Sequence, residues 1–456
     1  MARLRTFLLL LLLGSAAAML LSPGCRRDPV TGRLSFGLHH PSDAEEARQG
    51  REMAPGLVAA HDGVYPDAAA AAHLGAIVRR LGAASHRPRL PYRFTLLASS
   101  TPNAFALPGG EVFLTRGLLE RLDEEAQFAV VMAHEIGHVA HRHAVRALND
   151  SLIVGLGAEV IASSVEDHRR REAAAGLAAI GGGLLLLRFS REQELEADAR
   201  GVEYARAAGY DPRRGEQVFR GFARARREAG GRAGPLDSWI SSHPLDEDRV
   251  VHLRAEVERR WPGLRGGAPA PGLVVSTPAW DALLARVRAA SPHYARLDRA
   301  RAAAARALAA GDAGGARRSA AEAREAGRAL PGHALFPAVE GAILLALGDR
   351  AAARGPLERA RAAEPGLALA RVRLADLEAA EGRWEAASAE ARAAAALLPA
   401  DPSPRNALGR ALEGLRRPRD AARAYADAAR LAPSGSEEER RAVARLRAIE
   451  AAPGGR

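Results

Sequence analysis

The chain has 456 residues, which is enough for two or three domains that each bury a sizeable core. Its formal net charge is +11, and all 65 of its basic residues are Arg. Because these arginines are scattered through Ala-rich segments and only 4% of the residues are aromatic, the composition argues against a nucleic-acid-binding function.

The first 25 residues have the pattern of a signal peptide. Two arginines precede an apolar run over 7–21, and small residues follow it. Cys25 is the only cysteine, so the chain forms no internal disulfide. Its position resembles that of the lipidated cysteine of bacterial lipoproteins, although Pro23 is atypical and simple cleavage nearby is the alternative. In such lipoproteins an Asp directly after the cysteine often retains the protein at the inner membrane. Arg26 stands there instead, so the resemblance implies that this protein lies at the periplasmic face of the outer membrane.

Three short segments are predicted to be strands of a small sheet. They cover 94–98, 103–107 and 111–115, and Pro-Gly-Gly at 108–110 forms a turn between the last two. We expect 103–107 to be an edge strand, which could add an extended peptide to the sheet through backbone hydrogen bonds.

The most informative motif is His134-Glu135-Ile136-Gly137-His138, inside an apolar helix predicted over 127–140. Positions i and i+4 lie one turn apart on the same helix face, so both imidazoles can reach one metal ion. Glu135 stands beside the first imidazole, within reach of a metal-bound water. This is the H-E-x-x-H pattern that is typical of zinc metalloproteases.

A catalytic zinc site needs a third protein ligand. His141 lies on the same helix face, but the helical rise places it roughly 10 Å along the axis from His134, too far to share an ion. A third His six residues after the second is absent, because Ala144 stands there. We therefore interpret His141 and His143 as helix-surface residues.

Two apolar segments follow, over 152–164 and 176–187, with the charged residues 166–172 between them. Both are shorter than the roughly 20 residues that a membrane-spanning helix needs. We expect a hairpin that packs on the rest of the domain or forms a lid that contacts lipid or substrate.

Glu194 is the preferred third ligand. It lies in the segment 190–198, Ser-Arg-Glu-Gln-Glu-Leu-Glu-Ala-Asp, and shares a helix face with Asp198. Asp198 could accept the ring N–H of a ligand histidine and so fix its orientation. Glu192 and Glu196 are expected to be solvated. The alternative for the whole segment is an exposed acidic helix.

A third cluster, Ser-His-Pro-Leu-Asp-Glu-Asp-Arg, covers 242–249. Here His243 lies in a loop and Arg249 begins a helix. Either side chain could stabilise the oxyanion of a tetrahedral intermediate. His243 could instead fill the open zinc position and keep an enzyme latent, or be an ordinary loop histidine.

In this order, HEIGH, SRxxExEAD and SHPxxxxR resemble the motifs of the HtpX/BepA-type zinc metallopeptidases, which are gluzincins. The segments 28–33, 103–110 and 115–119 add to the resemblance, which covers roughly 26–262. It implies a zincin-like domain with one zinc ion. The residues that it assigns are the ligands His134, His138 and Glu194, the general base Glu135, and the supporting residues Asp198, His243 and Arg249.

The C-terminal third is repetitive. Prolines recur every 34 residues, and alanines recur five positions before each of them. Small residues also recur twelve positions before each proline, and Gly314, Gly348 and Gly382 stand seventeen before the first three, with Arg416 in the fourth place. A 34-residue period of this kind is the tetratricopeptide pattern. Stacked repeats form a curved surface that suits extended peptides or partner proteins.

The sequence therefore predicts an α+β, mostly helical chain of four parts. They are a signal peptide (1–25), a zinc metalloprotease domain with a small sheet (26–262), a linker with a lead-in helix at 280–290 (263–292), and a tetratricopeptide-repeat solenoid (293–456). The predicted function is a periplasmic zinc endopeptidase that degrades misassembled outer-membrane proteins. Its repeats would recruit substrates or the outer-membrane assembly machinery, as the resemblance implies. The alternative is a non-catalytic chaperone, against which the intact Glu135 speaks.

Overall fold

A computed structural model describes residues 25–27, 34–36, 41–147, 189–228, 239, 243–244, 247–265 and 270–451. The predicted apolar hairpin, over 152–164 and 176–187, lies outside these residues, as does the predicted signal segment up to residue 24. Within the described ranges, no helix combines the length and the apolar character needed to cross a membrane.

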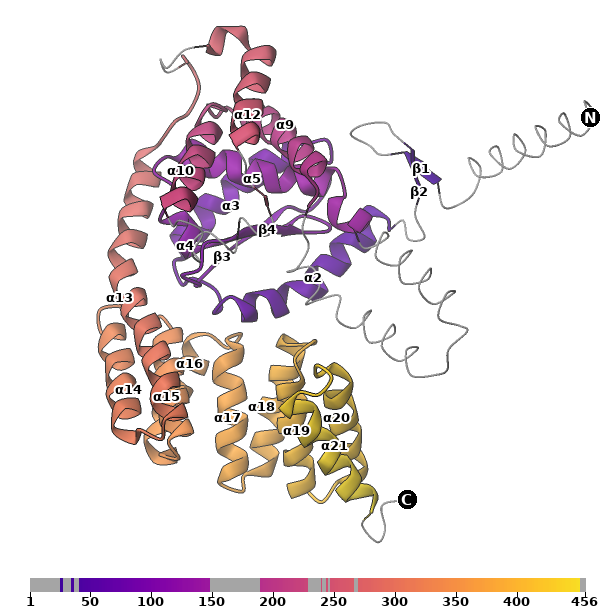
Figure 1. Ribbon diagram of the computed structural model, residues 1–456, viewed down its shortest axis with the longest axis vertical. Helices are drawn as coiled ribbons and strands as arrows, with labels where there is room; N and C mark the ends of the chain where they lie inside the picture. The colour runs from indigo at the N-terminus through magenta and orange to yellow at the C-terminus, as the bar shows by residue number, and fades with distance from the viewer. Residues whose placement is uncertain are drawn as a thin grey trace, which may run out of the picture.

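The first half of the chain forms what we call the N-terminal unit, residues 41–265 (Figure 1). Its helices are α2 (Asp43–Ala60), α3 (Ala68–Ala83), α4 (Arg116–Leu119), α5 (Glu125–Ala140), α9 (Arg191–Ala207), α10 (Arg214–Glu228), α12 (Glu247–Arg260) and the 3-10 turn η2 (Pro262–Leu264). Its strands are β3 (Arg93–Leu97), β4 (Ala104–Leu107) and β5 (Glu111–Thr115). The separate strands β1 (Cys25–Arg27) and β2 (Leu34–Phe36) pair antiparallel with each other.

The sheet of the N-terminal unit has the order β3-β5-β4. β5 pairs parallel with β3 and antiparallel with β4, in a register that places Phe105 opposite Phe113. The outer side of β3 is partly covered, because Tyr65 N donates to Leu96 O and Ala98 N donates to Gly63 O. β4 has no strand on its outer side among the described residues, so the predicted edge strand is confirmed.

Side chains alternate across this sheet and give it two covered faces. Leu97, Leu107 and Phe113 pack with Leu57 of α2 on one face. Val112, Leu114 and other β5 and β3 side chains join α3 and α5 in the main core on the other. This period of two is what a strand buried on both sides requires, and it explains why all five residues of β5 are buried.

Two glycines let α5 and α9 cross closely. A Cβ atom on Gly137 would lie 3.0 Å from Ala197 O, and one on Gly201 would lie 3.0 Å from His134 N. Because neither glycine carries a Cβ, the two helix backbones approach without a side chain between them. The crossing brings the HEIGH motif of α5 against the acidic segment that begins α9.

The second half of the chain is a row of antiparallel helices, which we call the helical array, residues 278–451 (Figure 1). Its members are α13 (Pro278–Ala309), α14 (Ala313–Gly327), α15 (Leu335–Ala346), α16 (Arg350–Ala363), α17 (Ala368–Ala380), α18 (Trp384–Leu397), α19 (Pro402–Gly414), α20 (Pro418–Leu431) and α21 (Glu437–Glu450). Consecutive helices pack on each other along the whole row.

The 34-residue period recurs in the structure. The residues Gly348, Gly382 and Arg416 all adopt left-handed backbone conformations two residues before the next helix begins. In the first hairpin this place belongs to Gly311, with φ 70°, and Gly314 lies inside α14 instead. The first connection is therefore three residues out of phase with the later ones.

The N-terminal unit and the helical array share one hydrophobic core, which runs from Tyr65 through α13 to Ala370. α13 is longer than the predicted lead-in helix and crosses residue 292, where the sequence analysis begins the repeats. Farther along, Glu364 accepts a hydrogen bond from Val64 N at 2.9 Å. The array is thus packed directly against the N-terminal unit.

Candidate metal centre

His134, Glu135 and His138 lie in the middle and last turns of α5, and all three are at most 4% exposed. The flanking apolar residues bury every side of this helix, so the three polar side chains lie inside the core of the unit. The Nε2 atoms of His134 and His138 face each other at 3.1 Å. The two rings thus converge on one point, as the i, i+4 spacing predicts.

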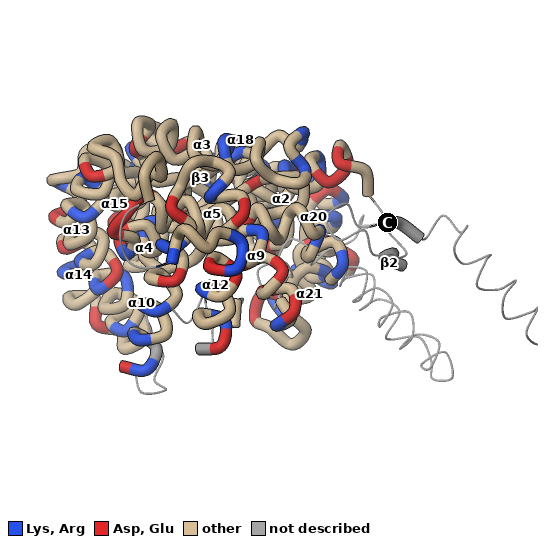
Figure 2. Tube along the Cα trace, turned by 90° about the horizontal axis from the view of Figure 1, so that it is seen from above, with Lys and Arg blue, Asp and Glu red and all other residues tan. Residues whose placement is uncertain are grey.

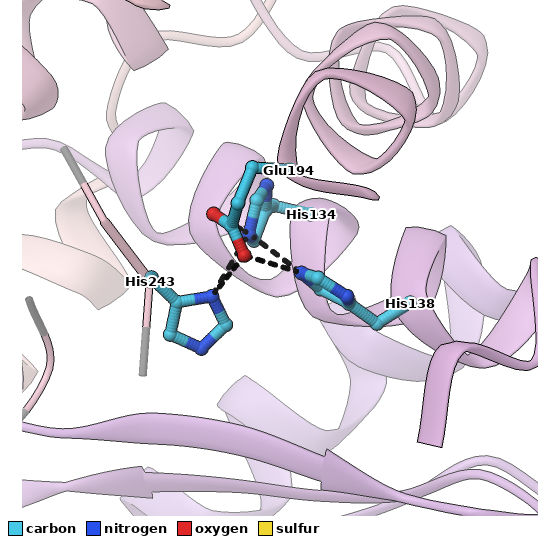
Figure 3. Close-up of side chains that lie close together, drawn as sticks. All are labelled: His134, His138, Glu194 and His243. Atoms are coloured by element: carbon cyan, nitrogen blue, oxygen red, sulfur yellow. Dashed lines mark hydrogen bonds and ion pairs between the residues drawn. The ribbon is translucent and has the colours of Figure 1, made fainter. Parts of the chain in front are cut away.

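α9 brings the carboxylate of Glu194 to the same point (Figure 3) and that of Asp198 to the outer side of the His134 ring. Glu194 Oε1 lies 3.4 Å from His138 Nε2, and Glu194 Oε2 lies 3.6 Å from His134 Nε2. One helical turn later, Asp198 Oδ1 lies 2.8 Å from the other nitrogen of His134, Nδ1. Because a carboxylate only accepts, Nδ1 carries the ring proton and Nε2 presents a lone pair to the centre.

Arg249, in the first turn of α12, binds both carboxylates. Its Nε and Nη2 atoms donate to Asp198 at 2.9 and 2.8 Å, and its Nη1 atom lies 2.6 Å from Glu194 Oε2. Nη1 also donates to Pro244 O at 2.8 Å. The guanidinium is fully buried and ties α12 and the loop before it to α9.

His243 reaches the same cluster from that loop. Its Nδ1 atom lies 3.1 Å from Glu194 Oε1 and 3.4 Å from His134 Nε2. Its Nε2 atom lies 3.7 Å from Glu135 Oε1, and its ring stacks on Trp239 with centroids 5.2 Å apart. His243 is therefore a buried member of the cluster and not an ordinary loop histidine.

These residues fit a zinc ion. One donor atom from each of His134, His138, Glu194 and His243 lies within 4.8 Å of the others, and all four side chains are buried. Two imidazoles and a carboxylate are the donors that catalytic zinc sites use, with a fourth position open to water or a further ligand. Glu135 Oε1 is buried with no hydrogen-bond partner in the described part of the chain, although it lies beside this point.

Burial and the neighbouring histidines together shift the pKa values of the carboxyl groups at the site. Burial raises the pKa of Glu135, although His243 and His134 nearby act against it. Burial would also raise the pKa of Glu194, but His243, His138 and His134 together hold it well below its usual range. Glu194 therefore stays ionised, as a ligand must, and Glu135 is a stronger base than an exposed carboxylate.

His141 and His143 are buried, with exposures of 1% and 0%, so the interpretation as helix-surface residues was wrong. α5 ends at Ala140, and Arg142 turns the chain with a left-handed φ of 55°. His143 therefore folds back onto His138, with their Nδ1 atoms 2.7 Å apart. Glu196 was expected to be solvated, but its side chain is only 19% exposed and lies 3.1 Å from His143 Nε2.

Comparisons with known proteins agree with this geometry. The model of "Peptidase family M48" matches residues 68–257. The beta-barrel assembly-enhancing protease of Escherichia coli (strain K12) is 29% identical over 202 residues, which are 42% of this chain and 39% of that protein. A putative beta-barrel assembly-enhancing protease of Vibrio cholerae is 31% identical over 197 residues, 41% of this chain and 38% of that protein.

A mitochondrial metalloendopeptidase OMA1 of Arabidopsis thaliana is 30% identical over 167 residues, 37% of this chain and 32% of that protein. The chain thus matches less than half of the length of these curated relatives. A solved structure titled "MamA RS-1 ArsTM double mutant" superposes on 33% of the chain with a TM-score of 0.27 and 18% identity, a similarity too low to support a conclusion. The predicted resemblance is confirmed by the family match: residues 68–257 form a domain of peptidase family M48.

Proposed function

We propose that this protein is a zinc-dependent endopeptidase of the bacterial cell envelope that degrades misassembled outer-membrane proteins. The observation that carries the proposal is the convergence of His134, His138 and Glu194 on one buried point with Glu135 beside it. The names of the relatives, beta-barrel assembly-enhancing proteases, link them to β-barrel assembly and so support this choice of substrate class.

In this proposal His134, His138 and Glu194 hold zinc, which when bound polarises the scissile carbonyl and acidifies water. Glu135 takes the proton of the attacking water and passes it to the leaving amine. Burial raises the pKa of Glu135, which makes it a stronger base for this step than an exposed carboxylate. The free side of β4 would align the substrate backbone by strand addition.

Replacement of Glu135 by Gln separates binding from chemistry. Glu135→Gln in the full chain should keep one zinc per chain and lose cleavage of casein and of an unfolded β-barrel protein by more than about 100-fold, the effect of losing a general base. Glu192→Gln, the same exchange at an exposed position of α9, should cleave at the parental rate. Parental cleavage by Glu135→Gln would refute the mechanism.

We assign Asp198 and Arg249 to positioning, and not to oxyanion stabilisation. Asp198 lies against the outward nitrogen of His134, and the guanidinium of Arg249 is occupied by two carboxylates and Pro244 O. Asp198 is a carboxylate and has no donor to offer an oxyanion, and these contacts already use four of the five guanidinium N–H groups of Arg249.

A latent state is the second candidate, and the position of His243 favours it. Its Nδ1 atom lies where a fourth zinc ligand would lie, and its Nε2 atom faces Glu135. We propose that this conformation keeps water from the metal. His243→Ala should therefore raise the rate of cleavage. A fall in the rate would show instead that His243 stabilises the transition state.

For the helical array we propose tetratricopeptide repeats that recruit substrates or the outer-membrane assembly machinery. The support is the 34-residue spacing of its later helices and their antiparallel packing. A groove of about 620 Å³ lies between α13 and α14, lined by Ala303 and by arginines that include Arg299, Arg306 and Arg318. Its lining also includes Asp312 and Glu322, which pair with Arg318 and Arg296, so it offers an extended polypeptide apolar surface and an excess of arginines over carboxylates.

Photo-crosslinking can locate the recruited segment. In the Glu135→Gln chain, a photoreactive residue at Ala303, which lines the groove, should crosslink to an unfolded β-barrel protein. The neighbouring exposed position Ala302 is the matched control and should not crosslink. Equal crosslinking at both positions would argue against the groove as the recruiting surface.

We also propose that the protein lies in the periplasm, attached to the outer membrane through a lipid on Cys25. The sequence pattern before Cys25 supports this location. Radiolabelled palmitate should enter the parent chain and not Cys25→Ser. Absence of label from both chains would contradict lipidation and favour the alternative, in which the signal segment is cleaved and the protein carries no lipid anchor.

A chaperone without catalysis is the competing function. In that case the chain would still bind unfolded β-barrel proteins, but its action on them would depend neither on zinc nor on Glu135. The presence of Glu135, buried beside the proposed metal ligands, speaks against a chaperone without catalysis. Protein binding alone gives no use for a buried carboxylate at this point.

A further inference from the structure

The two histidines of the HEIGH motif are supported in different ways. His134 has Asp198 directly against its Nδ1 atom at 2.8 Å. No carboxylate of the described residues lies against Nδ1 of His138. This atom instead meets Nδ1 of His143 at 2.7 Å, and Nε2 of His143 lies 3.1 Å from Glu196 Oε2. His138, His143 and Glu196 thus form a continuous chain that leads outward from the centre.

We propose that His143 and Glu196 are positioning residues that orient His138 as a metal ligand through this relay. The inference rests on the proposed function, because it takes His138 as a ligand of a zinc ion. It gives a role at the centre to two residues to which the sequence analysis gave none.

The proton positions in the relay follow from its ends. A ligand His138 presents the lone pair of Nε2 to the metal, so its proton is on Nδ1. His143 Nδ1 must then accept that proton in a hydrogen bond, which leaves the proton of His143 on Nε2. Glu196 can only accept, and its Oε2 atom lies where the Nε2–H of His143 points. Every donor therefore meets an acceptor, and only one arrangement of protons satisfies the chain.

The surrounding structure is built to hold this relay. The left-handed turn at Arg142 places His143 over His138, and Arg142 is fixed by Asp43 at 2.7 Å and by Glu46 at 2.8 Å. Phe189 covers the face of the His138 ring, with centroids 4.0 Å apart. All three carboxylates that serve the centre, Glu194, Glu196 and Asp198, come from the first half of α9.

A second metal ion held by His141, His143 and Glu196 is the alternative, since their donor atoms also lie within 4.8 Å of one another. The His141 and His143 rings are stacked, with centroids 5.2 Å apart and an interplanar angle of 21°, so their in-plane lone pairs lie in nearly parallel planes, an arrangement that disfavours a shared ion. Arg146 also brings a cation to 3.3 Å from Glu196 Oε2. Both observations favour the relay over an ion.

The test measures zinc affinity of the full chain by competition with a chelator, and the absorption spectrum of the Co²⁺-substituted protein. His143→Ala should weaken zinc binding about 10–100-fold, the usual effect of losing a group that orients a ligand, and should alter the Co²⁺ bands. His143→Asn should restore most of the affinity, because its Oδ1 atom can accept in the place of Nδ1. Glu196→Leu should weaken binding in the same direction, whereas Glu196→Gln, which retains an acceptor, should weaken it less.

His141→Asn is the matched control, since His141 stacks on His143 and lies 3.7 Å from the same carboxylate. It should leave the zinc affinity and the Co²⁺ spectrum close to those of the parent. Equal losses in His141→Asn and His143→Ala, or a second zinc equivalent that both variants lose, would overturn the relay.

The outcomes separate this inference from the proposed function. If the parent binds one zinc and His143→Ala binds it equally well with an unchanged Co²⁺ spectrum, the relay is refuted and the proposed function stands. If the parent binds no zinc, both are refuted. Circular dichroism of each variant establishes that it is folded, and His143→Asn tests the relay even if His143→Ala does not fold.

Discussion

The N-terminal unit and the helical array bury different kinds of side chain. The unit buries a dense set of ionisable groups at one end of α5, among them His134, Glu194 and Arg249, each at most 1% exposed. The array buries mainly alanine and leucine, and its few buried carboxylates pair with partly exposed arginines, as Glu378 does with Arg354 at 2.8 Å. Figure 2 shows arginines and acidic residues interspersed along its helices.

Buried ionisable groups are thus concentrated in the N-terminal unit, whereas the helical array mainly presents exposed surface. Buried charge is costly unless it is paired or bound to metal, so a structure retains it where it is used. A row of Ala-rich helices costs little to pack and presents a long exposed surface. We therefore expect substitutions in the two regions to separate stability from metal binding.

The largest expected effect comes from Arg249, whose loss leaves Asp198 and Glu194 as uncompensated buried charges. Arg249→Met should lower the free energy of unfolding by about 3–5 kcal/mol, measured by urea denaturation of the metal-free chain. Arg254→Met removes a half-exposed partner of Glu216 and should change it by less than about 1 kcal/mol. Equal effects would break the proposed contrast between buried and surface charge.

A matched pair of glycines sharpens the comparison. Gly201 meets the backbone of His134, and Gly341 in the array meets Leu357 and Ala353 O, so Leu at either position forces two helices apart. Each substitution should cost about 1–3 kcal/mol of stability. Only Gly201→Leu should also weaken zinc binding, because it displaces α9 from α5. Loss of zinc affinity in Gly341→Leu would show that the two regions are not independent.

The smallest effect concerns Arg416, a non-glycine residue in the left-handed conformation that Gly348 and Gly382 adopt at equivalent places. Arg416→Gly should raise the unfolding free energy of the array by about 1 kcal/mol, since glycine has no steric penalty there. Arg417→Gly, one residue later with φ −112°, is the control and should not stabilise. A lower melting temperature for Arg416→Gly would contradict this account of the turn.

Regular patterns in the sequence were sufficient to predict the regular parts of the structure. The strands are observed within one residue of their predicted bounds, and the helix predicted over 127–140 corresponds to α5. The spacing of Glu194 and Asp198 placed both on one face of α9. The structure brings these residues together with His134, His138 and His243, while their roles remain proposals.

Features set by distant contacts could not be predicted. A helix continued past Ala140 would place His143 on the surface, but the left-handed turn at Arg142 interrupts the helix and brings His143 onto His138. The residues that hold this turn, Asp43 and Glu46, precede it by about a hundred positions and belong to α2. The only local signal was a second pair of histidines directly after the motif, which by itself does not distinguish a surface from a buried position.

The central claim is that one zinc ion binds among His134, His138 and Glu194. A crystal of the full chain, grown with zinc and measured on both sides of the zinc absorption edge, tests it most directly. We predict a single anomalous peak in contact with the Nε2 atoms of both histidines and with the carboxylate of Glu194. No peak at that point, or a zinc peak between His141, His143 and Glu196 instead, would contradict the account.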